Sequence, residues 1–279
     1  MKTTLAALAP EFDGFLIDQF GVLLNGQGAY EEAPRTLCAL AAMGKEVILL
    51  SNSGKRAAPN EARLTRLGFD RASYKSVLSS GEAAFAEIGS RIGKDIAANS
   101  AVWVHSRDGD LSPVEGLPLR CVDDPGAADL LIIAGSRGDT FTLAHYRNWL
   151  APAAARRVPA FCTNPDMAML TPTGQCFGAG AIAQLFEDLG GAVEWVGKPY
   201  PLIYRIAHDM LGAPDRSRVL CIGDSPAHDI AGGKGAGFAT ALVRTGLHAD
   251  LSDDALLTLC KDTALPDYVI AGFSMEGRT

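Results

Sequence analysis

Four apolar runs in this chain each end on residues that can do chemistry. The run over 15–17 ends at Asp18, the run over 48–50 at Ser51 and Asn52, the run before Gly197 at Lys198, and the run over 220–223 at Asp224. These positions supply a nucleophile-type carboxylate, a hydroxyl, an ammonium and a second carboxylate. In open α/β sheets, ligands bind outside the carboxyl ends of the strands. A lone Asp after a strand is usually a turn or a helix cap, but four such endings predict one shared crevice.

The segments that must position these residues are short β-branched or Leu-rich runs, which alternate with segments of helical period. The expected strands cover residues 15–18, 46–51, 101–105, 129–134, 218–223, 239–243 and 268–271. A helix is expected from Pro34 to Met43, with Gly44 placed to end it. Another is expected after Ser225, a plausible N-cap before Pro226. This alternation predicts the α/β class, with a mostly parallel sheet covered by helices.

Two glycine-containing segments mark possible hinges, at Ser79-Ser80-Gly81 and at Gly190-Gly191. If both are hinges, residues 81–191 form an inserted domain. Residues 1–80 and 192–279 then combine into one core domain with a single sheet. A chain of 279 residues is long enough to bury two such cores.

The motifs at these positions resemble those of the haloacid dehalogenase (HAD) superfamily. In chain order they are Asp18-x-Phe20-Gly21-Val22, Leu50-Ser51-Asn52, Gly197-Lys198-Pro199 and Gly223-Asp224-Ser225-x-x-x-Asp229-Ile230. The Gly-Lys-Pro motif, with Thr163-Asn164-Pro165-Asp166 in the insertion, is similar to the NagD-like subfamily, IIA. The resemblance spans nearly the whole chain. It implies a Rossmann-like core with a parallel sheet and an inserted α/β cap of the C2 type.

The resemblance also implies a role for each motif residue. Asp18 would be the nucleophile that forms an aspartyl-phosphate, and Lys198 and Ser51 would act on the phosphoryl oxygens. The groups implied to bind phosphate are Phe20, Gly21, Ser51, Asn52 and Lys198, partly through backbone N–H groups. The implied ligands of a Mg²⁺ cofactor are Asp18, the backbone carbonyl of Phe20, Asp224 and Asp229.

Phe20 departs from the family pattern, in which most phosphatases carry a second Asp at this position. That Asp protonates the leaving group and then deprotonates the attacking water, and phenylalanine can do neither. Acid–base catalysis contributes about 10²- to 10⁴-fold. Four readings stay open. The chain is a phosphatase that acts slowly or on good leaving groups, a phosphatase with another acid/base recruited from the cap, a non-catalytic protein that binds a phosphorylated ligand, or a dehalogenase-type hydrolase. The last is disfavoured because Asp224 and Asp229 are both retained, which indicates magnesium and phosphate.

Composition narrows the partners and the location. The net charge is −7 and Lys and Arg form no basic run, which disfavours nucleic acid and anionic membranes as partners. The six cysteines form no Cys-x-x-Cys pair and indicate buried, reduced thiols. With no signal-peptide pattern and no long apolar stretch, we expect a cytoplasmic protein. Its expected partners are a small phosphorylated metabolite and, from the resemblance, a second copy bound through the cap.

Overall fold

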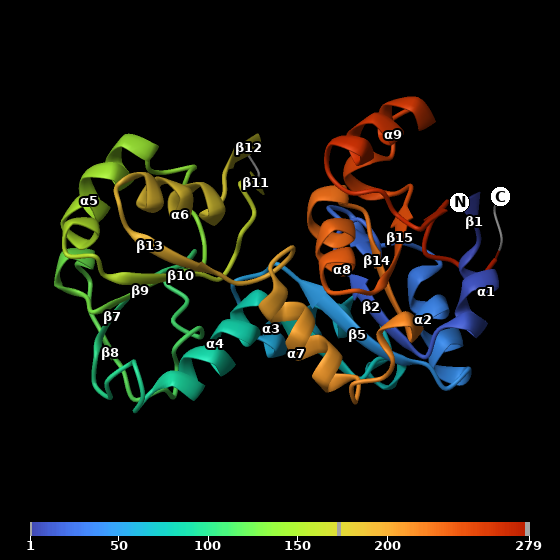
Figure 1. The fold of residues 1–279 in the computed structure, drawn as a ribbon, viewed down its shortest axis with the longest axis horizontal. Coiled ribbons are helices and arrows are strands. Elements are labelled where there is room, and N and C mark those ends of the chain that lie inside the picture. Colours follow the sequence, from blue (N-terminus) through green and yellow to red (C-terminus); the bar gives the residue numbers. More distant parts are fainter. Residues whose placement is uncertain (1, 172–173, 277–279) are drawn as a thin grey trace. The chain divides into compact units, whose positions relative to one another are not determined.

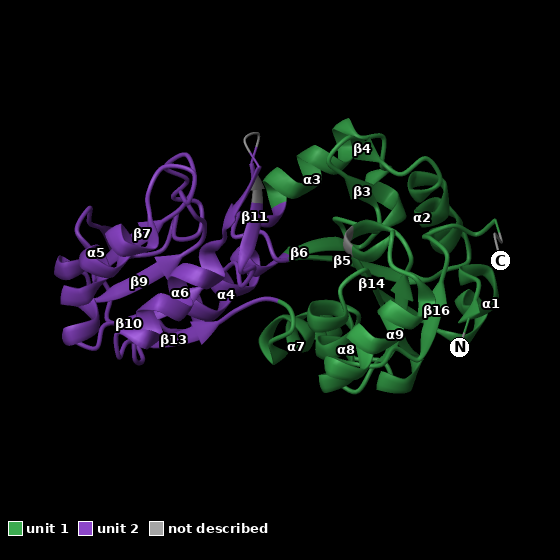
Figure 2. Ribbon diagram, turned by 90° about the horizontal axis from the view of Figure 1, so that it is seen from above, with its two compact units in different colours: residues 1–51, 58–78, 198–279 green, residues 52–57, 79–197 purple. Residues whose placement is uncertain are grey.

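The structure, a computed structural model, describes residues 2–171 and 174–276 (Figure 1). It divides into two compact units (Figure 2). Unit 1 comprises Met1–Ser51, Ala58–Leu78 and Lys198–Thr279, and unit 2 comprises Asn52–Ala57 and Ser79–Gly197. The chain therefore passes between the units directly after Ser51 and directly before Lys198, two of the residues singled out by their chemistry.

Unit 1 is built on a seven-stranded sheet within the described residues. In spatial order its strands are β1 (Lys2–Thr3), β16 (Tyr268–Ile270), β15 (Ala239–Val243), β14 (Val219–Gly223), β2 (Gly14–Asp18), β5 (Glu46–Ser51) and β6 (Ser76–Ser79). In this spatial order, each neighbouring pair of strands from β1 across the sheet to β5 is parallel. All residues of β2 and β14 are buried, as expected for central strands covered on both faces. The predicted Rossmann-like α/β class is confirmed.

Helices of unit 1 connect these strands. They are α1 (Leu5–Leu8), α2 (Ala33–Ala42), α3 (Ala57–Arg66), α7 (Pro201–Met210), α8 (Ala231–Gly235) and α9 (Asp253–Asp262), and a short hairpin of β3 (Leu24–Asn25) and β4 (Gly28–Ala29) follows β2. As predicted, α2 ends just before Gly44, which has φ of 70°. Ser225 caps the turn that begins at Pro226, since its side chain accepts from the N–H of His228.

Unit 2 has its own parallel sheet and its own core. Its strands, in spatial order, are β13 (Ala192–Trp195), β10 (Pro159–Cys162), β9 (Leu130–Ile133), β7 (Ala101–His105) and β8 (Arg120–Cys121). Its helices are α4 (Ser80–Arg91), α5 (Leu143–Ala155) and α6 (Ala179–Asp188), and β11 (Ala168–Thr171) pairs with β12 (Gly174–Phe177) as an antiparallel hairpin. Large side chains such as Trp103, Tyr146 and Phe186 fill its core.

The structure places three segments differently from the sequence expectation, and the shortest of them, residues 79–80, belongs to unit 2 rather than to the core domain. Residues 192–195 were assigned to the core domain, but they form β13, which pairs with β10 in the sheet of unit 2. Residues 52–57 were also assigned to the core, yet they pack in unit 2. There Arg56 forms a two-pronged ion pair with Glu82, at 2.7 and 2.9 Å. A side chain at Gly54 would have its Cβ 2.0 Å from the carbonyl oxygen of Ala134.

The cysteines and the helix lengths bear on the remaining expectations. Cys162, Cys221 and Cys260 are buried free thiols as expected, whereas Cys38 and Cys121 are exposed. Nowhere in the described ranges does a helix have both the length and the apolar character that crossing a membrane requires.

Candidate active site

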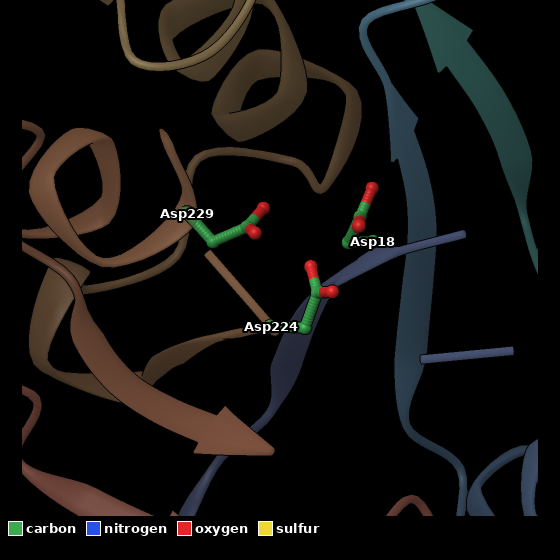
Figure 3. Close-up of side chains that lie close together, drawn as sticks. All are labelled: Asp18, Asp224 and Asp229. Atoms are coloured by element: carbon green, nitrogen blue, oxygen red, sulfur yellow. The ribbon is translucent and has the colours of Figure 1, made fainter. Parts of the chain in front are cut away.

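Three carboxylates meet at the carboxyl edge of the unit 1 sheet. Asp18, Asp224 and Asp229 each offer an oxygen, and these oxygens all lie within 4.8 Å of one another. Figure 3 shows the three side chains turned toward a common space. All three residues are at least nine-tenths buried, with exposed fractions of 8%, 3% and 4%. Buried carboxylates this close repel one another unless a cation lies among them.

Strand pairing explains why these residues converge. β2 and β14 are neighbours in parallel register, with Ile17 opposite Ile222. Asp18, the last residue of β2, and Asp224, the first residue after β14, therefore leave the sheet at the same edge. Asp229 reaches this edge from the π-helical turn Pro226–Ile230, and its Oδ2 accepts from the N–H of Ser225 at 3.1 Å. The predicted meeting of residues 18 and 224 is present in the structure.

Lys198 supplies the positive charge of this cluster. Its Nζ lies 2.5 Å from Asp18 Oδ1 and 2.7 Å from Asp229 Oδ1, and the residue is buried. The expectation that Lys198 follows a strand of the core sheet is wrong, because the strand before it, β13, belongs to unit 2. Lys198 is instead the first residue of unit 1 after that strand, in the loop that precedes α7.

Two glycines allow the backbone to close around Asp224. A Cβ at Gly21 would lie 2.1 Å from Asp224 Oδ2, and one at Gly246 would lie 2.0 Å from the same oxygen. Both glycines have positive φ, 91° and 76°, which residues with a side chain rarely adopt. Thr245 fixes this arrangement by donating from Oγ1 to the carbonyl oxygen of Gly21 at 2.6 Å. Our sequence reasoning identified Gly21 but missed Thr245 and Gly246, although they come soon after the predicted strand 239–243.

Burial and like charge dominate the electrostatics. Burial raises the pKa of Asp18 to about 8; Lys198 opposes this rise, and Asp229 and Asp224 add to it. Burial disfavours the Lys198 ammonium, but the carboxylates of Asp18 and Asp229 outweigh it and raise the pKa of Lys198 above its ordinary value. Lys198 is therefore held as a cation, and the carboxylates of Asp18 and Asp229 share its charge.

The donor set fits a hard divalent cation. Mg²⁺ takes oxygen ligands and is commonly bound by one or two carboxylates together with water and substrate phosphate. Asp18, Asp224 and Asp229 offer such oxygens within reach of one ion. The three carboxylates also exceed the single ammonium by two negative charges, which one Mg²⁺ would neutralise. The predicted metal ligands are therefore chemically suited to that role, and the backbone carbonyl of Phe20 stays a prediction.

The remaining predicted residues are divided between the two units. Ser51 ends β5, one residue beyond Leu50, which pairs with Asp18. Asn52 belongs to unit 2, where its Nδ2 donates to Asp166 Oδ1 at 2.8 Å. Phe20 is 49% exposed, which is unusual for so large an apolar side chain two residues after a buried carboxylate. The phosphate-binding roles of Ser51, Asn52, Phe20 and Gly21 stay predictions.

Comparison with known proteins places this edge in a family. The model of the haloacid dehalogenase-like hydrolases matches residues 15–119, and a second, HAD-hydrolase-like model matches residues 195–274. The sugar-phosphatase AraL of Bacillus subtilis is 31% identical over 261 residues, which are 92% of this chain and 89% of that protein. Mouse (Mus musculus) chronophin is 29% identical over 279 residues, which are 95% of this chain and 92% of chronophin.

A solved structure agrees with these relatives. The p-nitrophenyl phosphatase from Archaeoglobus fulgidus superposes with a TM-score of 0.78 at 27% identity, covering 94% of this chain and 97% of that one. The matched segments include Asp18, Lys198, Asp224 and Asp229. The chain therefore belongs to the haloacid dehalogenase-like hydrolases and, within them, to the NagD-like group.

Proposed function

We propose that this chain is a Mg²⁺-dependent phosphatase that hydrolyses a small phosphorylated metabolite through an aspartyl-phosphate on Asp18. The observation that carries the proposal is the convergence of Asp18, Asp224, Asp229 and Lys198 on one buried edge. The names of the relatives support it, because a sugar-phosphatase and a p-nitrophenyl phosphatase are among them.

In the first step, a carboxylate oxygen of Asp18 attacks phosphorus while the bond from phosphorus to the leaving oxygen breaks. The leaving group departs with the electron pair of that bond. In the second step, water attacks the phosphorus of the aspartyl-phosphate, which releases inorganic phosphate and restores the Asp18 carboxylate. Dividing the displacement in this way replaces one difficult step by two easier ones.

The other residues of the site orient Asp18 and offset the negative charge of the phosphoryl group. Lys198, already 2.5 Å from Asp18 Oδ1, holds the nucleophile in place and offsets negative charge on the phosphoryl oxygens. Asp224 and Asp229, with Asp18 and the Phe20 carbonyl, would hold Mg²⁺. When bound, that ion would cancel the surplus negative charge of the carboxylates and act as a Lewis acid toward the phosphoryl group.

Phe20 restricts which substrates this site turns over well. The leaving oxygen cannot take a proton from residue 20, so the site favours leaving groups that depart unprotonated, such as aryl or acyl phosphates. The missing proton transfer costs roughly 10²- to 10⁴-fold in rate, or about 3–5 kcal/mol of barrier, for alkyl phosphates. A protein that binds phosphorylated ligands without turnover is the second candidate function, and Phe20 is the residue that favours it.

The direct test is hydrolysis of p-nitrophenyl phosphate with and without Mg²⁺ by wild type and by Asp18→Asn. We expect Mg²⁺-dependent release of p-nitrophenol by wild type and none above background by Asp18→Asn. Asp13→Asn is the matched control, since it changes an exposed carboxylate that pairs with Arg218 ahead of the same strand. Equal activity of Asp18→Asn and wild type would rule out the nucleophile.

A panel of phosphorylated metabolites separates the two candidate functions. Each compound is scored for phosphate release and for the rise in unfolding temperature that a ligand causes. Stabilisation with release supports the phosphatase, and stabilisation without release of phosphate from any compound supports the binding protein. The homodimer through unit 2 stays a separate prediction, to be measured by sedimentation.

A further inference from the structure

Arg63 carries a charge that contacts no carboxylate. It lies in α3, and its Nη2 donates to Gln19 Oε1 at 2.8 Å and to Asn60 Oδ1 at 3.3 Å. Both acceptors are neutral amides. Among the residues described in the structure, none forms an ion pair with Arg63. Fully buried charges are ordinarily paired; Arg63 is only partly buried, and neutral amides rather than a carboxylate accept its hydrogen bonds.

The cluster around Arg63 also holds unused donors. Gln19 Nε2 and Arg63 Nε are buried, and no hydrogen-bond partner for either lies among the residues that the structure describes. Gln19 is only 1% exposed, although it lies between Asp18 and Phe20 in the chain. A guanidinium only donates, so the amide oxygen of Gln19 must face it and the amide nitrogen must face away. Each buried donor left unpaired is costly, and both donors would suit negative charge.

This cluster adjoins the active site through Gln19, which follows Asp18 directly. Burial lowers the pKa of Arg63, as does the neighbouring charge of Arg66, and the carboxylate of Asp18 raises it. The charges of Arg63 and Asp18 are therefore close enough to interact electrostatically. Asn60, 4% exposed on the same helix, holds the guanidinium from the other side.

The charge balance of the active site gives this guanidinium a use. Three carboxylates and the Lys198 ammonium leave two negative charges, which one Mg²⁺ would cancel. A phosphate monoester then brings about two further negative charges, since its second pKa lies near 6. The charge of Lys198 is already counted in this balance, whereas that of Arg63, which donates to neutral amides, is not.

We propose that Arg63, held by Gln19 and Asn60, is a specificity-determining residue whose charge strengthens binding of the phosphoryl dianion beside Asp18. The inference deepens the proposed function and depends on it for the identity of the anion. Opposite unit charges roughly 10 Å apart at an effective dielectric constant near 20 attract enough to change affinity about tenfold. Arg63 would thereby favour dianionic monoesters over monoanionic diesters.

The test measures the affinity of the full chain for inorganic phosphate, by calorimetry at pH 8 in saturating Mg²⁺. Two neutral variants, Arg63→Met and Arg63→Gln, should each bind phosphate about tenfold more weakly than wild type. Arg63→Lys, which keeps the charge, should stay within about threefold. Arg66→Met is the matched control, because it removes the same charge from an exposed position three residues later in α3, and it should change affinity less than about twofold.

A purely structural role for Arg63 predicts different kinetics. If the charge of Arg63 stabilises the bound substrate and the transition state equally, its loss raises KM for p-nitrophenyl phosphate about tenfold and leaves kcat nearly unchanged. Distortion of the turn after Asp18 would lower kcat instead, and Arg63→Lys would not restore it. Circular dichroism and unfolding temperature show whether each variant is folded, and Arg63→Gln keeps an amide for Gln19 and Asn60 should Arg63→Met fail to fold.

The outcomes distinguish this inference from the proposed function. If neutral Arg63 variants bind phosphate as wild type does, or if wild type binds none, the inference is wrong. If phosphate binding depends on Arg63 but no monoester is hydrolysed, the inference stands and the phosphatase proposal falls. If hydrolysis depends on Asp18 but phosphate affinity does not depend on the charge at residue 63, the phosphatase proposal stands and the inference about Arg63 is wrong.

Discussion

Units 1 and 2 each contain a parallel sheet with buried central strands, yet the residues at their carboxyl edges differ in charge. In unit 1, β2 ends at Asp18, and Asp224 follows β14 directly. In unit 2, β7 ends at His105, whose ring stacks on Trp103 with centroids 5.2 Å apart and hydrogen-bonds the Tyr146 hydroxyl at 2.8 Å. Burial, with a smaller effect of Arg137, lowers the pKa of His105 to about 4, so this edge holds a neutral imidazole near pH 7.

The contrast shows that a parallel sheet determines where a site can form, whereas the side chains at its carboxyl edge determine which reaction is possible there. The edge of unit 2 borders a cavity of about 480 Å³, whose lining includes His105 and Trp149. Aromatic packing and a satisfied hydrogen bond stabilise that edge. The edge of unit 1 instead collects like charges around one ammonium, which costs stability until a cation and an anion bind.

The largest expected effect distinguishes the two edges directly. Asp224→Asn should lower Mg²⁺-dependent hydrolysis of p-nitrophenyl phosphate by at least about 100-fold, because it removes a metal ligand and a charge. The same change should leave the metal-free protein as stable as wild type or more so, since it relieves repulsion with Asp18. His105→Gln, at the edge of unit 2, should leave kcat within about twofold. If Mg²⁺ activated Asp224→Asn as strongly as wild type, Asp224 could not be a ligand of the metal.

The second prediction concerns the apolar residue at the edge of unit 1. Phe20→Asp should raise turnover of alkyl phosphates by about 10²-fold, because a carboxylic acid can then protonate the leaving oxygen. Aryl phosphates, which need no proton, should change far less. The measurement is kcat for glycerol phosphate and for p-nitrophenyl phosphate, with Phe20→Asn as the control that cannot transfer a proton. Equal gains on both substrates would remove the leaving-group explanation.

The third prediction is a pH dependence confined to unit 1. The pKa of Asp18 in the folded, metal-free protein, about 8, exceeds its ordinary value of 3.8. Between these values the folded state binds the extra proton, so the stability of the metal-free protein falls as pH rises through this range. Mg²⁺ must displace that proton, so its apparent affinity should rise up to about tenfold per pH unit and level off above pH 8. Calorimetric titrations from pH 6 to pH 9, at roughly unit steps, test this; an affinity independent of pH would contradict it.

The smallest effect is expected in unit 2. Tyr146→Phe removes the hydrogen bonds that the hydroxyl makes with His105 and with the N–H of Arg137, and it should cost about 2 kcal/mol, or roughly 4–8 °C in unfolding temperature. The kcat of the enzyme should not change. Tyr30→Phe serves as control, because the Tyr30 hydroxyl makes no hydrogen bond within the described structure. A large loss of activity in Tyr146→Phe would show that the edge of unit 2 takes part in the chemistry.

Short-range patterns were sufficient to predict much of the fold and of the site. Apolar runs predicted β2, β5, β7, β9, β14, β15 and β16 to within one or two residues, because a strand buried on both faces must be continuously apolar. The residue types after those runs predicted Asp18 and Asp224 as partners, since parallel neighbours end at the same edge of a sheet.

Those patterns did not predict which of the two units each segment would join. Residues 192–195 were assigned to the core domain, but pairing with β10 places them in unit 2. Residues 52–57 likewise join unit 2 through Glu82 and Ala134, which lie far along the chain. Pairing partners are set by contacts between distant segments, and an apolar run pairs equally well with either sheet.

The amino-acid sequence by itself determined which side chains the edge of unit 1 would carry: a nucleophilic carboxylate, its acidic neighbours, a lysine and an apolar residue 20. Only the tertiary structure decided that Lys198 lies between Asp18 and Asp229, that Gly246 closes on Asp224, and that Gln19 holds Arg63. The physical reason is that charge and hydrophobicity belong to each residue. Distances between charges, and so their energies, arise only once remote segments pack together.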